Sequence, residues 1–228
     1  MTAMDDEMED ARAAMVREIE RTMADLAPRS GRLALSSRVL DVMRETPRHL
    51  FVSPGHLQEA YLNRPVQIGY RQTISQPLIV ALMTDLLDLA PEDKVLEVGT
   101  GSGYQTAVLA RLARSVYTIE LCAPLAERAA RVLADLGIGN VETRIGDGHL
   151  GWPEEAPFDA ILVAAAPPEV PEALVRQLKP GGRLVLPVGI LNQQLIVVEK
   201  RSDQSTVLRE IIPVCFVPLT RHGTPSEL

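Results

Sequence analysis

The sequence has few cysteines, few aromatic residues and no long apolar run. Its two cysteines, Cys122 and Cys215, lie far apart and outside any zinc-type spacing, so neither a disulfide framework nor a metal cluster is indicated. The four histidines are scattered without ligand spacing, and we expect no bound metal. No stretch approaches the roughly 18 consecutive apolar residues of a membrane span, so we expect no membrane partner.

The charge balance and the aromatic content limit the possible partners. A formal net charge of -7 opposes a large phosphate-binding surface, and aromatic residues, at 4%, are too sparse for a base-stacking groove. We therefore expect no nucleic-acid partner. The first residues, 1–7, are acidic where a signal peptide would be basic, which indicates a cytoplasmic protein, and we expect a monomer.

What the chain does contain is an alternation of helix and strand patterns over 228 residues, enough for one α/β domain with a sizeable core. Helices are predicted over residues 4–26, 36–46, 77–89, 104–113, 124–136 and 169–178, the first of them broken by the Pro-Arg-Ser-Gly cluster at 28–31. Strands are predicted over 94–98, 115–120, 141–145, 158–163 and 183–187, followed by an antiparallel edge pair over 195–199 and 214–219. Residues 51–77 are predicted to form a long structured loop or short strands.

The most informative segment is Lys-Val-Leu-Glu-Val-Gly-Thr-Gly-Ser-Gly-Tyr at 94–104, where a buried strand enters a glycine turn that opens a helix. Gly99 and Gly101 let the backbone approach a ligand, which indicates a nucleotide site. A dinucleotide fingerprint would need glycine or alanine at Tyr104, and Glu97 would repel a pyrophosphate. S-adenosylmethionine fits better, because it has an ammonium group for Glu97 and no phosphate. The alternative for Glu97 is a carboxylate that only caps nearby backbone N–H groups.

Two further acids follow the next two predicted strands. Glu120 ends its strand about 20 residues after the glycine turn, where a carboxylate can accept hydrogen bonds from both ribose hydroxyls. Asp147, in Gly-Asp-Gly, can accept a hydrogen bond from an adenine amino group, and Gly148 lets the backbone approach. Each acid alone is more often a turn residue or a helix cap. Because ligands bind beyond the carboxyl ends of such strands, we expect the three acids to converge on one ligand.

This order of motifs, with Phe-Asp-Ala-Ile at 158–161 and Leu-Lys-Pro-Gly-Gly at 178–182, resembles the class I S-adenosylmethionine-dependent methyltransferases. Within that superfamily the chain is similar to the protein-L-isoaspartate O-methyltransferase family. The segments that carry this resemblance are Thr-Pro-Arg-His-Leu-Phe-Val at 46–52, Ile-Gly-Tyr-Arg-Gln-Thr-Ile-Ser-Gln-Pro at 68–77, Ala-Ala-Ala-Pro-Pro at 164–168, Leu-Pro-Val-Gly at 186–189 and Phe-Val-Pro-Leu at 216–219.

The resemblance implies an α/β fold: a Rossmann-like, doubly wound seven-stranded sheet in a three-layer αβα sandwich, with extra N-terminal helices. It also implies a single methyltransferase domain over 1–228. Residues 1–35 would form a helical N-terminal extension, 36–77 a helix and a substrate and cofactor loop, and 78–228 the Rossmann-like core with the C-terminal strands.

The resemblance also implies roles for individual residues. Ser75 would be the catalytic serine. The S-adenosylmethionine contacts would be Gln72, Thr73, Ile74, Ser75, Glu97, Gly99, Gly101, Glu120, Asp147, Gly148 and Thr220. The substrate contacts would be Tyr70, Ile74, Ser75, Val217 and Pro218, and the substrates would be peptides and proteins that contain L-isoaspartyl residues. Arg71 and Cys215 depart from many bacterial relatives, and residues 29–35 look like an insertion.

The chemistry of such a substrate limits what Ser75 has to do. A free α-carboxylate is ionised at neutral pH, so a positioning hydroxyl suffices and no general base is needed. The alternatives are a methyltransferase for a small molecule or another nucleophile, an NAD-dependent oxidoreductase, and a binding module that lacks turnover. Glycine spacing and Glu97 disfavour the oxidoreductase, and an intact Ser75 disfavours the binding module.

Overall fold

The computed structural model describes residues 3–30 and 34–221, so the predicted insertion is described only in part, and residues 1–2, 31–33 and 222–228 lie outside the described residues. Helix α1 spans Ala3–Ser30 and α2 spans Ser37–Glu45. Helix α1 ends at Ser30, four residues beyond the predicted end at residue 26 and inside the Pro-Arg-Ser-Gly cluster that was predicted to break it. The start of α2 is as predicted, since the Ser36 hydroxyl accepts a bond from the Val39 N–H at 3.4 Å.

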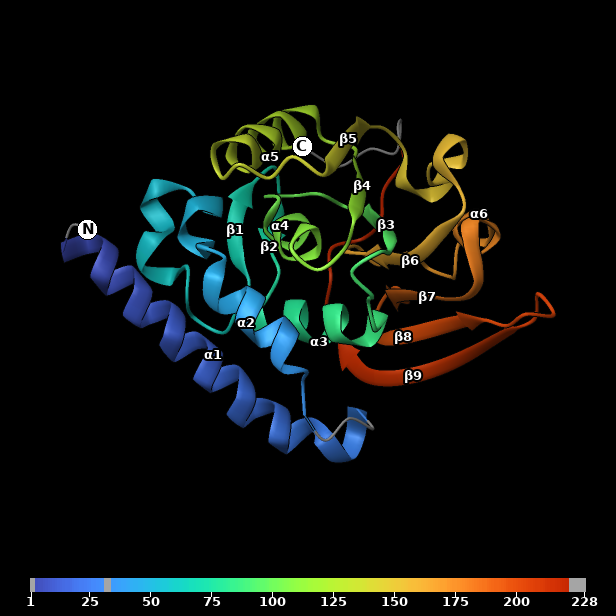
Figure 1. Ribbon diagram of the computed structural model, residues 1–228, viewed down its shortest axis with the longest axis horizontal. Coiled ribbons are helices and arrows are strands. Elements are labelled where there is room, and N and C mark those ends of the chain that lie inside the picture. The colour runs from blue at the N-terminus through green and yellow to red at the C-terminus, as the bar shows by residue number, and fades with distance from the viewer. Residues whose placement is uncertain (1–2, 31–33, 222–228) are drawn as a thin grey trace.

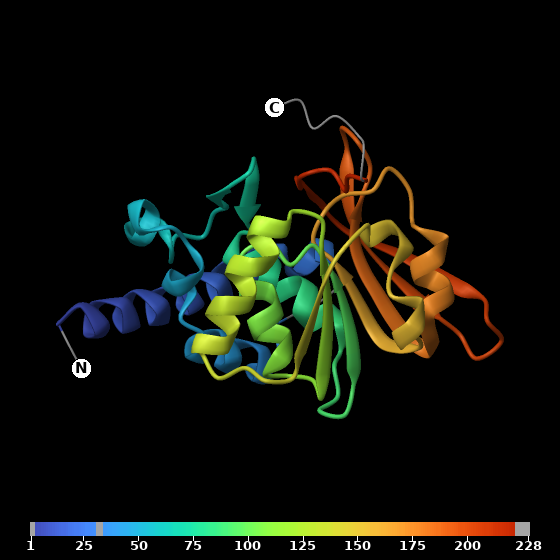
Figure 2. The same ribbon diagram turned by 90° about the horizontal axis from the view of Figure 1, so that it is seen from above.

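Short elements connect α2 to the core, as predicted for residues 51–77. Two 3-10 turns, η1 (Arg48–Phe51) and η2 (Pro54–Glu59), precede a hairpin of β1 (Val66–Gly69) and β2 (Gln72–Ile74). At the tip of this hairpin Tyr70 and Arg71 both adopt the left-handed conformation, with φ of 53° and 57°. The hairpin stands apart from the main sheet in Figure 2.

The core is one seven-stranded sheet with strand order β5-β4-β3-β6-β7-β8-β9. The strands are β3 (Lys94–Val98), β4 (Ser115–Glu120), β5 (Val141–Ile145), β6 (Phe158–Val163), β7 (Leu178–Val188), β8 (Gln193–Lys200) and β9 (Thr206–Val214). The first five run parallel, and the β7–β8 and β8–β9 pairs are antiparallel. The chain winds from β3 outward to β5 and then returns to β6 on the other side of β3, so the topological switch point lies at the carboxyl end of β3.

Helices cover both faces of this sheet (Figures 1 and 2). Helices α3 (Pro77–Leu87), α4 (Tyr104–Ala110) and α5 (Ala123–Asp135) lie on one face, and α6 (Glu172–Gln177) with the turns η3 (Gly148–Leu150) and η4 (Pro153–Glu155) lies on the other. The long α1 packs on α2 and α3 at the outside of the first layer. The predicted three-layer fold with extra N-terminal helices is confirmed. Among the described residues, no helix is both long and apolar enough to cross a membrane.

Each face has its own apolar core, because the parallel strands are buried on both sides. On the first face, Val95, Ala107 and Leu125 belong to a large cluster that also includes buried residues of α1, α2 and α3. On the second face, Leu96, Ile161 and Leu174 belong to a smaller cluster. The alternation of neighbouring Val95 and Leu96 between the clusters follows from the two-residue period of a strand.

Two predictions in the C-terminal third are wrong. Strand β7 begins at Leu178, so the Lys-Pro-Gly-Gly run lies inside the strand, where the register with β6 shifts between Phe158 and Ala160. The outer strand of the edge pair is β9 at Thr206–Val214 rather than 214–219. The first five residues of β9 are exposed, so this strand lacks the apolar pattern of a buried strand. The segment 214–219 is more apolar, but it contains Pro218, which cannot donate a ladder hydrogen bond.

Close packing at the switch point requires a glycine after β5. A Cβ built on Gly148 would lie 2.2 Å from Cγ1 of Val98, the last residue of β3. Val98 is β-branched and 1% exposed, so it has little freedom to move aside. The turn after β5 and the end of β3 therefore touch only because residue 148 has no side chain.

We predict that Gly148→Ala destabilises the protein by about 1–3 kcal/mol, the usual cost of overpacking a core. Gly146→Ala is the matched control, because a Cβ at Gly146 meets nothing within 4 Å and the φ of Gly146 is not positive. Denaturant unfolding of both variants measures the difference. Equal free energies of unfolding for the two variants would contradict the close approach.

Candidate cofactor and acceptor site

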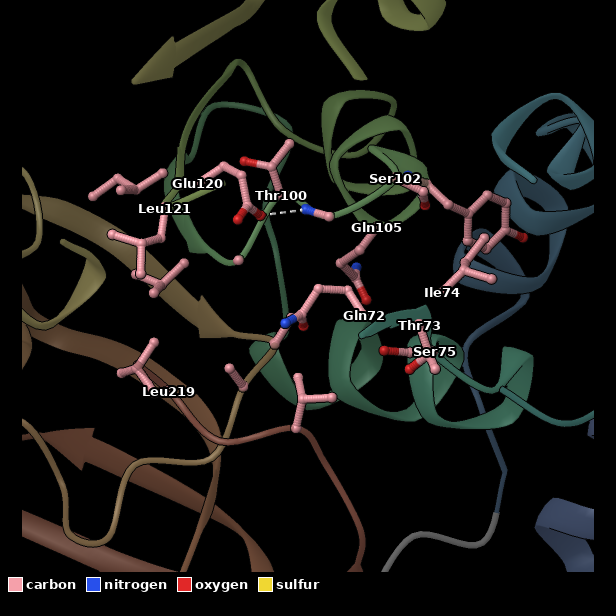
Figure 3. Close-up of a pocket in the computed structure, with 18 of the residues that line it drawn as sticks. Gln72, Thr73, Ile74, Ser75, Thr100, Ser102, Gln105, Glu120, Leu121 and Leu219 are labelled. Carbon is pink, nitrogen blue, oxygen red and sulfur yellow. Dashed lines mark hydrogen bonds between the residues drawn. The ribbon is translucent and has the colours of Figure 1, made fainter. Parts of the chain in front are cut away.

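A cavity opens at the carboxyl ends of β3, β4 and β6, and we call it the central cavity (Figure 3). Of the residues predicted to form the site, its walls include Gln72, Thr73, Ile74, Ser75, Gly99, Gly101, Glu120, Val217, Pro218 and Thr220. The walls enclose about 90 Å³, less than the roughly 300–1,000 Å³ of typical ligand pockets. A nucleoside-sized ligand needs more room than this, and Figure 3 draws the Gln72 side chain between Glu120 and Ser75.

The glycine turn forms one wall of the central cavity, and the backbone N–H groups of its three glycines are bonded within the protein. Gly99 donates to the Ile119 carbonyl, and Gly103 donates to the Thr100 carbonyl, both at 2.8 Å. Gly101 donates to Oε2 of Glu120, also at 2.8 Å, the bond drawn in Figure 3. Among the described residues, no Lys, Arg or His lines the central cavity. A pyrophosphate would find no cation among them, so the cavity suits a cofactor without phosphate.

Glu120 is held rigidly at the end of β4. Its Oε1 accepts a hydrogen bond from the Cys122 N–H at 2.9 Å while Oε2 is bonded to Gly101. Each carboxylate oxygen can accept a second bond, so the side chain, 8% exposed at the cavity wall, keeps acceptor capacity for hydroxyl groups. This arrangement fits the predicted role of Glu120 in holding a ribose.

Asp147 does not reach the wall of the central cavity. It lines an adjoining cavity of about 590 Å³ beyond Ile119, the one residue that both cavities share. Its Oδ1 accepts bonds from the backbone N–H of His149 and contacts Nδ1 of the same residue, each at 2.9 Å. The backbone still links the strand ends, because the Gly146 N–H donates to the Glu120 carbonyl at 2.9 Å. The adenine contact of Asp147 and Gly148 stays a prediction.

Glu97 lies behind the wall of the central cavity rather than on it, and its contact with an ammonium group stays a prediction. The residue is fully buried, and its Oε2 accepts hydrogen bonds from the hydroxyls of Thr106 at 2.5 Å and Thr118 at 2.7 Å. The cause is register: Glu97 is the penultimate residue of β3, so its side chain points into the layer between the sheet and α4. Its Oε1 has no hydrogen-bond partner among the described residues.

A chain of hydroxyl groups nevertheless connects Glu97 to the cavity. The Thr118 hydroxyl gives its proton to Glu97, so the 2.6 Å contact between the Thr118 and Thr100 hydroxyls has Thr100 as the donor. Thr100 lines the central cavity. Burial raises the pKa of Glu97 to about 7, although the two threonine hydroxyls oppose that shift.

Ser75 lies where the central cavity meets a second one. This side cavity, of about 490 Å³, shares Thr73, Ser75, Ala164 and Val217 with the central cavity, and its remaining walls are Pro65, Gln76, Ile79 and the segment 213–216. No charged residue lines it. The helix cap of α3 is Gln76 rather than Ser75, and the Ser75 hydroxyl has no hydrogen bond to another described residue. The hydroxyl is therefore available to a ligand at the junction.

The C-terminal segment 215–219 forms the partition between the two cavities, and two sets of hydrogen bonds hold it. Ala166 bonds on both sides, with its N–H to the Val217 carbonyl and its carbonyl to the Leu219 N–H, each at 2.8 Å. The buried Gln193 side chain bonds both the N–H and the carbonyl of Phe216, at 2.6 and 3.0 Å. Val217 and Pro218 thus belong to a fixed wall, while Tyr70 is 60% exposed and lies in neither cavity.

Several residues that line the central cavity were not predicted as site residues from the sequence. They are Val80, Val98, Thr100, Ser102, Tyr104, Gln105, Ile119, Leu121, Ala164, Ala165 and Leu219. Thr100, Ser102 and Tyr104 sit inside the glycine motif, so its spacing could have included them. The others are apolar or helical residues that look like ordinary core, and only the fold brings them together.

The chain resembles known proteins both in sequence and in structure. The family described as protein-L-isoaspartate(D-aspartate) O-methyltransferase matches residues 22–224. The chain is 54% identical over 221 residues to protein-L-isoaspartate O-methyltransferase 1 of Cupriavidus necator, covering 96% of this chain and 85% of that one. It is 54% identical over 220 residues to protein-L-isoaspartate O-methyltransferase 2 of Syntrophobacter fumaroxidans, covering 96% and 89%.

The chain belongs to the protein-L-isoaspartate(D-aspartate) O-methyltransferase family. A solved protein-L-isoaspartate O-methyltransferase superimposes with a TM-score of 0.78 at 28% identity, covering 91% of this chain and 65% of that one. A second, from Plasmodium falciparum in complex with S-adenosyl-L-homocysteine, gives a TM-score of 0.78 at 24% identity, covering 92% and 98%, and shows the shared fold.

Membership of this family means that the chain uses S-adenosylmethionine. The central cavity suits that cofactor, because its wall offers acceptor oxygens of Glu120 for hydroxyls and, among the described residues, no cation for a phosphate. The predicted cofactor residues that the structure brings together are Gln72, Thr73, Ile74, Ser75, Gly99, Gly101, Glu120 and Thr220.

The raised pKa of Glu97 predicts a pH-dependent stability. A carboxyl group whose pKa rises from 4.5 unfolded to about 7 folded favours folding most below pH 4.5, and the benefit is lost as the pH rises to 7. We predict that Glu97→Gln gains stability relative to the wild type by about 3 kcal/mol between pH 4.5 and 8. Urea unfolding at several pH values measures this gain.

Glu142→Gln, on the exposed face of the edge strand β5, is the matched control for the same charge removal. Its difference from the wild type should stay flat over that pH range. A flat difference for Glu97→Gln as well would show that Glu97 titrates normally in the folded protein.

Proposed function

We propose that this chain repairs damaged proteins by moving the methyl group of S-adenosylmethionine to the free α-carboxylate of L-isoaspartyl residues. Family membership supports this reaction. The observation in the structure that carries it is the position of Ser75, whose residue lines both the central cavity and the side cavity. One cavity takes the methyl donor and the other takes the peptide, so the two meet at the serine.

The acceptor needs orientation more than activation. An isoaspartyl α-carboxylate has a pKa near 3.5, so it arrives as a nucleophile. S-adenosylmethionine, when bound, supplies an electrophilic methyl group on a sulfonium. Ser75 donates a hydrogen bond to one carboxylate oxygen and leaves the other free to attack. The apolar walls Ala164 and Val217 keep water away from the carboxylate, which preserves its reactivity.

Release from the enzyme completes the repair. Methylation converts the carboxylate into an ester whose methoxy group can leave. The neighbouring backbone nitrogen of the peptide attacks the ester carbonyl, its proton passes to the methoxy oxygen, and methanol leaves as a succinimide forms. Water then opens the succinimide partly to a normal aspartyl bond. No further side chain of this chain is required for these steps.

Peptide recognition must accept many sequences, and main-chain contacts suit that need. The partition segment 215–219 is extended, and the Val217 N–H has no hydrogen bond to another described residue. Together with Ile74 and the exposed Tyr70 on the hairpin, it offers an edge for an extended peptide. An isoaspartyl backbone is one methylene longer than normal, which brings its carboxylate to Ser75 where an aspartyl side chain falls short.

We also propose that the chain acts as a cytoplasmic monomer and binds no nucleic acid. Both cysteines are free, as in a reducing compartment. No basic residue in the described part of the chain lines the central or the side cavity, so these residues offer a backbone phosphate no partner. A methyltransferase for a small molecule is the alternative, and the side cavity, with room for about 490 Å³, does not by itself exclude it.

The test is transfer of a labelled methyl group to two peptides of one sequence, carrying L-isoaspartate or L-aspartate. We predict methylation of the isoaspartyl peptide at least tenfold faster. Ser75→Ala should lower kcat by at least tenfold and change the Kd for S-adenosylhomocysteine by less than threefold, because the hydroxyl contacts the acceptor. Ser53→Ala, a serine outside both cavities, is the matched control.

Similar rates for the two peptides would remove the proposed geometry of recognition. Equal losses of turnover and cofactor affinity in Ser75→Ala would place the hydroxyl in the cofactor site instead. Methylation of neither peptide by the wild type would leave the small-molecule alternative.

A further inference from the structure

Arg48 is a fully buried cation at the back of the acceptor site. It begins the turn η1, its side chain is 0% exposed, and it forms no ion pair with a described carboxylate. Buried arginines are normally paired, because an uncompensated charge in the interior costs several kcal/mol. The presence of Arg48 here therefore requires another explanation.

The contacts of Arg48 lead to both walls of the central cavity. Its Nη2 donates to the backbone carbonyl of Ser75 at 2.7 Å, and its Nε donates to the carbonyl of Ala60 at 2.7 Å. The guanidinium carbon lies 4.7 Å from the ring centroid of Tyr104, the first residue of α4 after the glycine turn. Arg48 thus fixes Ser75, on the acceptor side, against Tyr104, on the cofactor side.

One nitrogen of the buried guanidinium is left without a partner in the described part of the chain. Its Nη1 has no hydrogen-bond partner among the described residues. Burial lowers the pKa of Arg48 to about 10, so the group is still charged at neutral pH. The nearest anion that the proposed reaction brings to this region is the acceptor carboxylate at Ser75.

We propose that Arg48 is a positioning residue for methyl transfer: it holds Ser75 in the orientation that presents the acceptor carboxylate to the methyl donor. This inference rests on the proposed function. Arg48 acts through the Ser75 main chain and does not line either cavity. The planar guanidinium of arginine suits this role. Two of its nitrogens donate to two backbone carbonyls, and its carbon lies over the Tyr104 ring.

A double-mutant cycle with Ser75 tests the proposal. We predict that Arg48→Gln lowers kcat for an isoaspartyl peptide by at least tenfold, while the Kd for S-adenosylhomocysteine changes by less than threefold. In the Ser75→Ala background, Arg48→Gln should lower kcat by less than a further twofold, because there is no longer a hydroxyl to orient. Arg48→Lys keeps the charge but loses the fork, and it should recover part of the turnover.

Arg38→Gln is the matched control, because Arg38 also binds two backbone carbonyls, those of Leu89 and Leu112, but away from both cavities. It should lower the melting temperature and leave kcat unchanged. Activities are compared at a temperature at which circular dichroism shows each variant to be folded. If Arg48→Gln does not fold, the same cycle is run with Arg48→Lys.

Three results would overturn the role of Arg48. The first is that the losses of kcat from the two substitutions multiply in the double variant. The second is that Arg48→Gln loses S-adenosylhomocysteine binding in proportion to turnover. The third is that Arg48→Gln turns over as fast as the wild type. A wild type that methylates no isoaspartyl peptide overturns the proposed function together with this inference. A wild type that is active but gives multiplicative losses overturns this inference alone.

Discussion

The turn that follows β3 must close within five residues between a buried strand and a buried helix, and the rest of the site depends on that constraint. It closes because Gly99, Gly101 and Gly103 all adopt positive φ and because each of their N–H groups finds an acceptor inside the protein. The Gly101 bond to Glu120 ties the end of β3 to the end of β4. The N–H groups of the three glycines are thus already used, and the turn leaves the oxygens of Glu120 at the cavity wall.

Behind each wall of the site lies one buried ionisable group without an opposite charge. Glu97 stands behind the glycine turn, bonded to threonine hydroxyls, and Arg48 stands behind Ser75, bonded to carbonyls. Their signs are opposite to those of the reactants that meet in front of them, a sulfonium donor and a carboxylate acceptor. The hydrogen-bond partners of Glu97 and Arg48 are uncharged, so they do not cancel the electric field of either group. That field favours a cationic donor in front of Glu97 and an anionic acceptor in front of Arg48.

The sequence was sufficient for the parts of the fold in which one pattern dominates locally. Strands β3, β4, β5 and β6 begin and end at the predicted residues. For β3, β4 and β6 the reason is that buried parallel strands are short, largely apolar runs between turns. It failed for β9, whose exposed residues follow the β8 edge rather than a pattern of their own. In the site, the glycine turn and Glu120 were predictable from spacing. Three other features arise only when distant segments pack together. They are the direction of the Glu97 side chain, the separate cavity at Asp147, and the contact between Arg48 and Ser75, which are 27 residues apart.

The central claim is that Ser75 marks the junction at which donor and acceptor meet. A crystal structure with S-adenosylhomocysteine and an isoaspartyl peptide tests it most directly. We predict the nucleoside in the central cavity beside Glu120, the peptide along the side cavity, and the free α-carboxylate within hydrogen-bond distance of the Ser75 hydroxyl. A carboxylate bound away from Ser75, or a nucleoside confined to the cavity lined by Asp147, would contradict the account.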